Sequence, residues 1–309
     1  MKRIFCLIMA ILLGAVCLPA QSQDLKNEDN QPATESETLL AKPAKSKLKI
    51  GLRLYGGMNF LDGGDINDTN GYIDFYSYQS ELHGFPFTID AGGLNRCLEG
   101  GADLLVYLGE RFGVSLGAAY LKGSRENLLT LTVPESPPVT ATFRCEPQIE
   151  SIPVNLGLFY ILPLGGRFNL VADAGGGWTF AWLKIIDRFE MPDGSDQSLA
   201  KGDAGGIHGF ARLALEVKIR RGLFFFVEAV GRYARISGFK GSQEMYENDV
   251  LTSTTYGTFH TVTWGNPGPE FRVIQIKQET PFGLEKIDSA KTVIDYSGVS
   301  ARAGVRIRF

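Results

Sequence analysis

The amino-acid sequence predicts an all-β fold, and three observations lead to this prediction. Glycine is frequent, at 37 of 309 residues, and aromatic residues make up 11% of the chain. After the first twenty residues, no run is apolar over the roughly 18 residues that a membrane helix needs. From residue 47 onward, apolar and polar residues alternate with period two, which places them on opposite faces of strands. The apolar content of 44% excludes disorder of the whole chain, and the formal charge of −3 is too small and too evenly mixed for a nucleic-acid-binding surface.

The first 22 residues predict a cleaved export signal. Lys2 and Arg3 precede an apolar segment from 4 to 16, and small residues follow it at a cleavage site. This segment is too short for a membrane anchor, and the residue before Cys17 is too large for lipid attachment there. Residues 23–46 are rich in polar residues, alanine and proline without periodicity, which predicts a flexible periplasmic linker. Residues 47–309 then form the folded domain.

Eight stretches of this domain alternate in hydrophobicity. In the first, Leu48, Ile50 and Leu52 face one way, and Lys49 and Arg53 face the other. The last stretch, near the end of the chain, repeats the pattern with alanine, valine and isoleucine opposite arginine and serine. The eight stretches are 47–60, 97–108, 112–122, 150–163, 167–182, 206–219, 223–237 and 292–309.

The connections between these stretches alternate in length. Tight turns lie at 109–111, 164–166 and 220–222, and long links lie at 61–94, 123–145, 183–205 and 238–290. A soluble barrel would turn its apolar face inward, whereas a membrane barrel with short turns at one end and long loops at the other turns it outward. The pattern favours an eight-stranded antiparallel up-and-down transmembrane β-barrel with long extracellular loops and short periplasmic turns.

Two sets of side chains support the membrane orientation. Aromatic residues gather near the strand ends, as expected for two interfacial girdles: Tyr120, Trp178, Phe180, Trp182 and Tyr233 on the loop side, and Phe112, Phe168 and Phe225 on the turn side. Charged residues of both signs occupy the polar faces, which predicts a salt-bridged network filling the lumen. The expected lumen charges are Lys49, Arg53, Glu99, Asp103, Asp173, Arg212, Glu216, Lys218, Glu228, Arg232, Arg302, Arg306 and Arg308.

The end of the chain resembles the C-terminal insertion signal of outer-membrane barrels, through Arg302, Gly304, Ile307 and Phe309. The run from Ser151 to Leu156 also resembles the Ile-Pro strand of PorT-like outer-membrane β-barrel domains. Together with OmpA/OmpX-type barrels, these resemblances imply a small integral outer-membrane protein of a Gram-negative envelope. They also imply recognition by the barrel-insertion machinery, and they transfer no catalytic residue.

Two cysteines remain after the export signal is removed, Cys97 and Cys145. The mature chain lies in a compartment that permits disulfides, so the two could pair or stay free. In mid-sheet, one intervening strand would hold them too far apart for a bond. Above the barrel rim the chain can lean inward, and we expect a disulfide there.

No catalytic, metal or cofactor site is expected. The three histidines have no metal-binding spacing, and the acidic turn from Asp65 to Gly71 lacks the spacing of a calcium loop. His208 on a polar face suggests a base beside a serine, but no nucleophile motif accompanies it. The first function hypothesis is therefore a non-enzymatic, monomeric barrel that serves envelope integrity or surface binding through its large loops.

Two other functions stay open. The first is a narrow conduit for small or hydrophobic solutes, which an excess of lumen cations would make anion-preferring. The second is an outer-membrane lipid-modifying enzyme. The expected partners are outer-membrane lipids and lipopolysaccharide, together with a surface ligand or protein that contacts the long loops.

Overall fold

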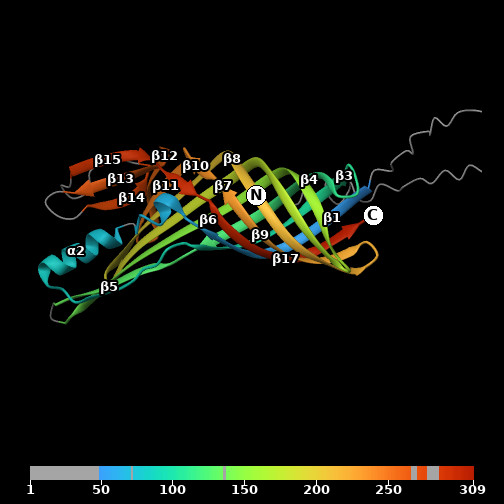
Figure 1. Cartoon of the computed structure of the whole chain (residues 1–309). Coiled ribbons are helices and arrows are strands. Elements are labelled where there is room, and N and C mark those ends of the chain that lie inside the picture. The colour runs from blue at the N-terminus through green and yellow to red at the C-terminus, as the bar shows by residue number, and fades with distance from the viewer. Residues whose placement is uncertain (1–48, 71, 135–136, 266–269, 277–284) are drawn as a thin grey trace, which may run out of the picture.

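The computed structural model describes residues 49–70, 72–134, 137–265, 270–276 and 285–309, and these residues are almost entirely β-strand (Figure 1). The signal and linker predicted for 1–46 lie outside the described residues. The helices are η1 (Gly64–Ile66) and α2 (Ile73–His83), and neither is long and apolar enough to cross a membrane. The strands are β1 (Lys49–Leu61), β2 (Phe87–Asp90), β3 (Arg96–Tyr107), β4 (Phe112–Ser124), β5 (Asn127–Val133), β6 (Val139–Gly165), β7 (Phe168–Met191), β8 (Gly194–Arg220), β9 (Leu223–Tyr233), β10 (Arg235–Ser237), β11 (Lys240–Glu247), β12 (Val250–Thr258), β13 (His260–Gly265), β14 (Phe271–Gln275), β15 (Glu285–Lys291), β16 (Val293–Asp295) and β17 (Gly298–Arg308).

Eight of these strands, which coincide with the eight predicted stretches, pair in a fixed antiparallel order. The order is β1, β3, β4, β6, β7, β8, β9 and β17, and β17 pairs in turn with β1. The predicted all-β, antiparallel class is confirmed. The count of eight strands was too low, because the described residues contain seventeen strands and the main sheet alone has twelve.

The two faces of the main sheet have inverted polarity. Leu158 and Leu213 are 69% and 52% exposed on the outer face, whereas Arg53 and Asp103 on the inner face are 1% and 0% exposed. A soluble barrel buries its apolar residues and exposes its charged ones, which is the opposite arrangement. The outer surface between the two strand ends is therefore an apolar belt around a polar interior.

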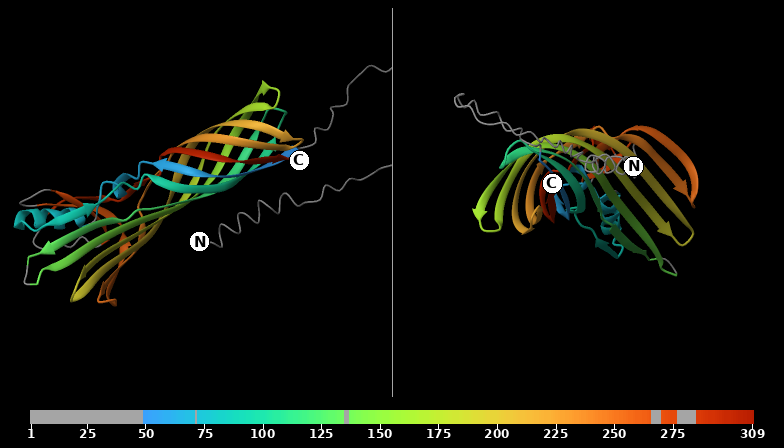
Figure 2. Two further views of the ribbon diagram at one scale, coloured as in Figure 1. Left: turned by 90° about the horizontal axis from the view of Figure 1, so that it is seen from below. Right: turned by 90° about the vertical axis from the view of Figure 1, so that its right-hand side faces the viewer.

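The loop-end extension is formed by strands that continue beyond the apolar belt. β6 and β8 each have 27 residues and β7 has 24, so the predicted long links at 123–145 and 183–205 are mostly strand. β5 pairs with the start of β6, and β11 pairs with the start of β8. These links are strands because their sequences keep the period-two pattern, with buried Phe143 and Ile185 facing inward. The extended sheet flares away from the turn end (Figure 2).

A second hydrophobic core fills this extension. It combines buried side chains of β5, β6, β7 and β8 with residues from the connecting segments, including Ile73 of α2 and Phe259 before β13. Tyr76 of α2 stacks on Phe143 and Phe189, with ring centroids 4.3 and 5.7 Å apart. Aromatic residues of the first long link are thus partly packed inward. Within the long link at 238–290, β13 pairs antiparallel with β14.

The expected disulfide between Cys97 and Cys145 is wrong, because both cysteines are free and buried. Cys97 on β3 lies against Gly123 of β4, whose partner on β6 is Ile149. Cys145 is four residues along β6 from Ile149, roughly 13 Å at the usual rise per residue. Continuous pairing of β4 with β6 holds the two thiols at different heights, so the chain does not lean inward between them.

Candidate functional site

The interior of the barrel contains ten of the thirteen predicted lumen charges. All ten are at most 7% exposed. They comprise five arginines and five carboxylates, and no other charged residue among those described is this deeply buried in the barrel interior. The buried charges are Arg53, Glu99, Asp103, Asp173, Arg212, Glu216, Glu228, Arg232, Arg302 and Arg306.

Arg212 and Asp103 form the middle of this network. Arg212 Nη1 lies 2.5 Å from Asp103 Oδ2, and its Nε lies 3.6 Å from Asp173 Oδ2. Ser115 Oγ donates to Asp173 Oδ2 at 3.0 Å, and Arg53 Nη1 lies 3.9 Å from Asp103 Oδ2. The chain leaves room for these groups, since a Cβ at Gly117 would collide with the Asp103 carboxylate.

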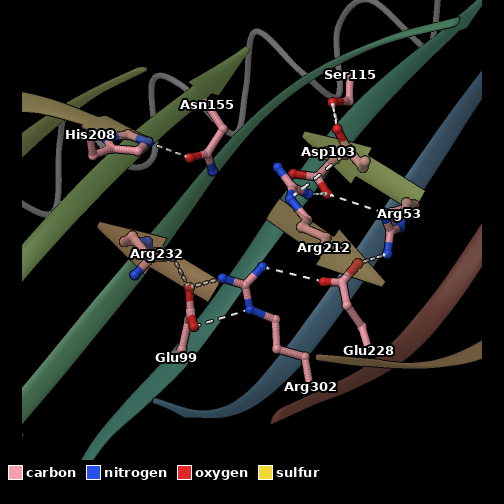
Figure 3. Close-up of polar contacts among 11 residues, drawn as sticks. Arg53, Glu99, Asp103, Ser115, Asn155, His208, Arg212, Glu228, Arg232 and Arg302 are labelled. Carbon is pink, nitrogen blue, oxygen red and sulfur yellow. Dashed lines mark hydrogen bonds and ion pairs between the residues drawn. The ribbon is translucent and has the colours of Figure 1, made fainter. Parts of the chain in front are cut away.

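Glu99 connects two arginines nearer the loop end (Figure 3). Arg232 Nη2 lies 2.8 Å from Glu99 Oε1, and Arg302 donates to both oxygens of the same carboxylate. Ser300 Oγ donates to Glu99 Oε2 at 2.8 Å. Arg302 also reaches Glu228 at 3.4 Å, and Glu228 accepts from Arg53. One continuous set of contacts thus joins seven strands across the lumen.

A separate pair closes the lumen near the turn end. Arg306 Nη2 lies 2.6 Å from Glu216 Oε2, and Arg306 also donates to the hydroxyl of Tyr107. The guanidinium stacks over the Phe224 ring, with its carbon 4.1 Å from the centroid. Both charged side chains are at most 2% exposed. A buried pair of this kind is costly to break, because one charge would be left unpaired.

Aromatic side chains between the arginines were not predicted as part of the site. Arg53 lies over Phe226 and Arg212 over Phe210, each 4.3 Å from the ring centroid, and Arg302 lies over Tyr55 at 4.7 Å. Such cation–π contacts add attraction when both partners are desolvated. The period-two pattern could have identified these rings, since Phe226 lies on the same face of β9 as Glu228 and Arg232.

The predicted excess of lumen cations is wrong. Lys49 and Lys218 are exposed, because they occupy the turn-side ends of β1 and β8, where side chains reach solvent. Arg308 is half-buried over the Tyr107 ring, with its carbon 4.4 Å from the centroid. The buried charges that remain are equal in number and opposite in sign, so the interior has no formal charge to select an anion.

His208 belongs to a small polar cluster above the charges. Its Nε2 lies 2.7 Å from Asn155 Oδ1, and its Nδ1 lies 2.9 Å from Thr179 Oγ1. A hydroxyl, an imidazole and an amide in this order resemble a hydrolase triad. However, Thr179 is 1% exposed and His208 is 6% exposed. Side chains occupy the space that a substrate would need.

The predicted girdle lies on the outer surface. Trp178, Phe180 and Tyr233 toward the loop end are 44 to 66% exposed, and Tyr120 and Trp182 are half-buried. Phe112, Phe168 and Phe225 toward the turn end are 42 to 50% exposed. Of the insertion pattern, Arg302 points into the network, Gly304 pairs with Tyr55 and Ile307 with Leu52, and Phe309 is 60% exposed.

The loop-end core contains one buried acid beside a cysteine. Asp187 on β7 lies opposite Cys145 on β6, and the thiol donates a hydrogen bond to its carboxylate. Asp187 Oδ1 is buried without a partner among the described residues. Burial raises the pKa of Asp187 to about 6, although the hydrogen bond from Cys145 opposes this shift. Burial also raises the pKa of the Cys145 thiol well above its usual value.

The acidic turn near Asp65 is occupied by protein donors. Asp65 Oδ2 accepts from Thr261 Oγ1 and from the Val293 amide, each at 2.7 Å. The side chain of Asn67 accepts from the Leu94 amide at 2.6 Å. Within the described residues, no group of three or more histidine, cysteine or acidic side chains is placed to hold a metal ion.

Comparisons with known proteins give similarity of structure but none of sequence. No family model matches the chain, and no curated protein matches its sequence. Among solved structures, the outer membrane protein OprG from Pseudomonas aeruginosa aligns with 85% of this chain and 96% of that chain. The sequence identity is 15% and the TM-score is 0.36. The class of protein is therefore inferred from the pairing and side chains of this chain itself.

We predict that Glu216→Gln destabilises the fold by about 3–5 kcal/mol, because it leaves Arg306 buried without its countercharge. The double variant Glu216→Gln/Arg306→Met should lose less than the sum of the two single variants. Denaturant unfolding measures both effects. Arg188→Met in the exposed Arg188–Glu190 pair is the control, and it should change stability by at most about 1 kcal/mol. Equal losses at Glu216 and Arg188 would contradict the buried pair.

We also predict that stability depends on pH through Asp187. The Asp187 carboxyl keeps its proton to a higher pH in the folded chain than in the unfolded chain. The free energy of unfolding therefore falls as pH rises from about 4 to about 6. Asp187→Asn removes this fall and should be more stable than the parent at pH 7, with little difference at pH 4. Asp193→Asn, at an exposed acid in the nearby turn, should follow the parent at both values. Parallel pH profiles for Asp187→Asn and the parent would refute the assignment.

Proposed function

We propose that this chain is an integral outer-membrane β-barrel that is closed to solutes and acts through its loop-end extension. The observation that carries this proposal is the inverted polarity of the main sheet. An apolar belt around ion-paired side chains is stable in lipid and unfavourable in water. Membership of the OmpA/OmpX-type or PorT-like barrels, and assembly through the C-terminal pattern, are part of the proposal.

The strand pairing supports a closed eight-stranded barrel across the membrane. In lipid, every strand edge must be paired, because no water is present to satisfy free backbone groups. The eight long strands each pair with two neighbours in cyclic order. On β8, outward residues from Gly205 to Ile219 belong to the belt, and this length suits a tilted membrane strand.

Two layers inside the chain support a non-conducting role. The first is the balanced network of buried charges, which fills the lumen together with the stacked aromatic rings. The second is the hydrophobic core of the extension, which lies above the lumen and includes Phe239, Phe259 and Tyr296, each at most 1% exposed. A solute would have to displace both layers, so the conduit is the weaker hypothesis. Burial of Thr179 likewise makes the lipid-modifying enzyme the weaker hypothesis.

The loop-end extension is the part of the chain suited to a binding role. Long structured segments beyond a rigid barrel are usually functional. The exposed strand β12 lies at one edge of the main sheet and carries Val250, Leu251 and Tyr256 at 52 to 79% exposure. A surface ligand, a protein or lipopolysaccharide would meet this part of the chain first.

We predict that Leu213→Arg destabilises the folded barrel in lipid vesicles by about 2–4 kcal/mol, because Leu213 lies midway along the apolar belt. Thr254→Arg on exposed β12 is the matched control and should change stability by at most about 0.5 kcal/mol. Denaturant unfolding in vesicles, monitored by tryptophan fluorescence, measures the free energy of unfolding of both variants. Similar effects of the two arginines would contradict a membrane-facing belt.

A conductance measurement separates the closed barrel from the conduit. We expect the purified full chain in planar bilayers to give no ion-conducting steps, because the charge network and the loop-end core both block the lumen. Reproducible steps with anion preference would instead favour the conduit. Loss of acyl chains from lipid A in cells expressing the protein would favour the enzyme.

A further inference from the structure

The turn end of the barrel is exposed and strongly basic. Six cations lie on the tight turns or at the turn-side ends of strands, and all six are exposed. Among the described residues at this end, Glu110 is the single exposed acidic side chain. The six residues, called the turn-end rim below, are Lys49, Arg111, Arg167, Lys218, Arg220 and Arg221.

The two ends of the barrel differ in how their exposed cations are paired with acidic residues. At the loop end, several exposed or half-exposed cations have acidic partners, as in Lys122–Glu150 at 3.3 Å and Arg144–Glu126 at 3.0 Å. None of the six rim cations forms an ion pair with a described residue. Unpaired charges of one sign repel each other, so the rim gains most from an external anion.

The outer girdle places the rim at the depth of lipid headgroups. Phe112, Phe168 and Phe309 are 48 to 60% exposed on the outer surface, and an arginine directly precedes each of them. Aromatic rings prefer the boundary between hydrocarbon and headgroups. The neighbouring guanidinium of Arg111 or Arg167 therefore lies one residue further toward water, where lipid phosphates lie.

We propose that the turn-end rim binds the headgroups of anionic phospholipids in the leaflet that faces the turns. This inference rests on the proposed membrane barrel. Each lysine or arginine near an anionic surface contributes roughly 1 kcal/mol, or about fivefold in binding, and the effect weakens with salt. Arginine is well suited to phosphate because its planar group donates two hydrogen bonds at once.

An acidic segment of this chain is the alternative anionic partner for the turn-end rim. Residues 24–37 carry Asp24, Glu28, Asp29, Glu35 and Glu37 with one lysine, and this segment precedes β1 at the turn end. If the segment neutralised the rim, lipid preference would be absent in the parent. It would appear only after the five acids were changed to amides, and that result would overturn the lipid proposal.

The test uses the full mature chain refolded in vesicles of phosphatidylcholine alone or mixed with phosphatidylglycerol. Retained lipids are counted by native mass spectrometry after gentle detergent extraction. The rim variant is Arg111→Gln/Arg167→Gln/Arg221→Gln. The control is Lys122→Gln/Lys184→Gln/Lys201→Gln, which removes three cations at the loop end and so gives the same change in net charge.

We expect the parent and the control to retain phosphatidylglycerol in preference to phosphatidylcholine. The rim variant should lose this preference by roughly fivefold for each cation removed, and high salt should abolish it in all three proteins. Equal preference in the rim variant and the control overturns the inference. Failure of the parent to fold in either type of vesicle would instead refute the membrane barrel, so the two failures are distinguishable.

Discussion

The pairing of five buried arginines with five buried carboxylates is the constraint on which the rest of the structure depends. A buried charge costs several kcal/mol unless an opposite charge and hydrogen bonds compensate it. Asp103 meets Arg212 and Arg53, and Glu99 meets Arg232 and Arg302. These contacts cross the lumen between strands that are distant in sequence. They fix the interior and leave the outer face free to be apolar.

Small and aromatic residues complete this interior by different means. Gly117 leaves space that the Asp103 carboxylate occupies, and Gly304 brings the backbone of β17 close to Phe226 and the main chain of β1. Aromatic rings fill the gaps between the guanidinium groups and keep water away from them. The result is a lumen filled by its own side chains, which is the expected condition for the proposed eight-stranded barrel.

Beyond the apolar belt, the long strands enclose a hydrophobic core instead of charged side chains. There β6, β7 and β8 keep their alternation but exchange charged inner residues for apolar ones such as Phe143, Leu183 and Ile185. In the proposed membrane barrel, the change from polar to apolar interior coincides with the change from lipid to water outside. A sheet in water needs a hydrophobic core, whereas the polar groups inside a sheet in lipid need hydrogen-bond or ion-pair partners within the protein. The loop-end core therefore gives a rigid platform to the segments proposed to bind partners.

The sequence by itself determined the all-β class, the positions of eight of the strands and their two faces, because a period of two is a local property of the chain. It also identified the charges that meet in the lumen, apart from Lys49, Lys218 and Arg308 at the strand ends. Tertiary structure alone decided the charge balance, the aromatic rings over the arginines and the separation of Cys97 from Cys145. Each of these depends on which residues lie opposite one another, and register between distant strands is set by the packing of the whole sheet.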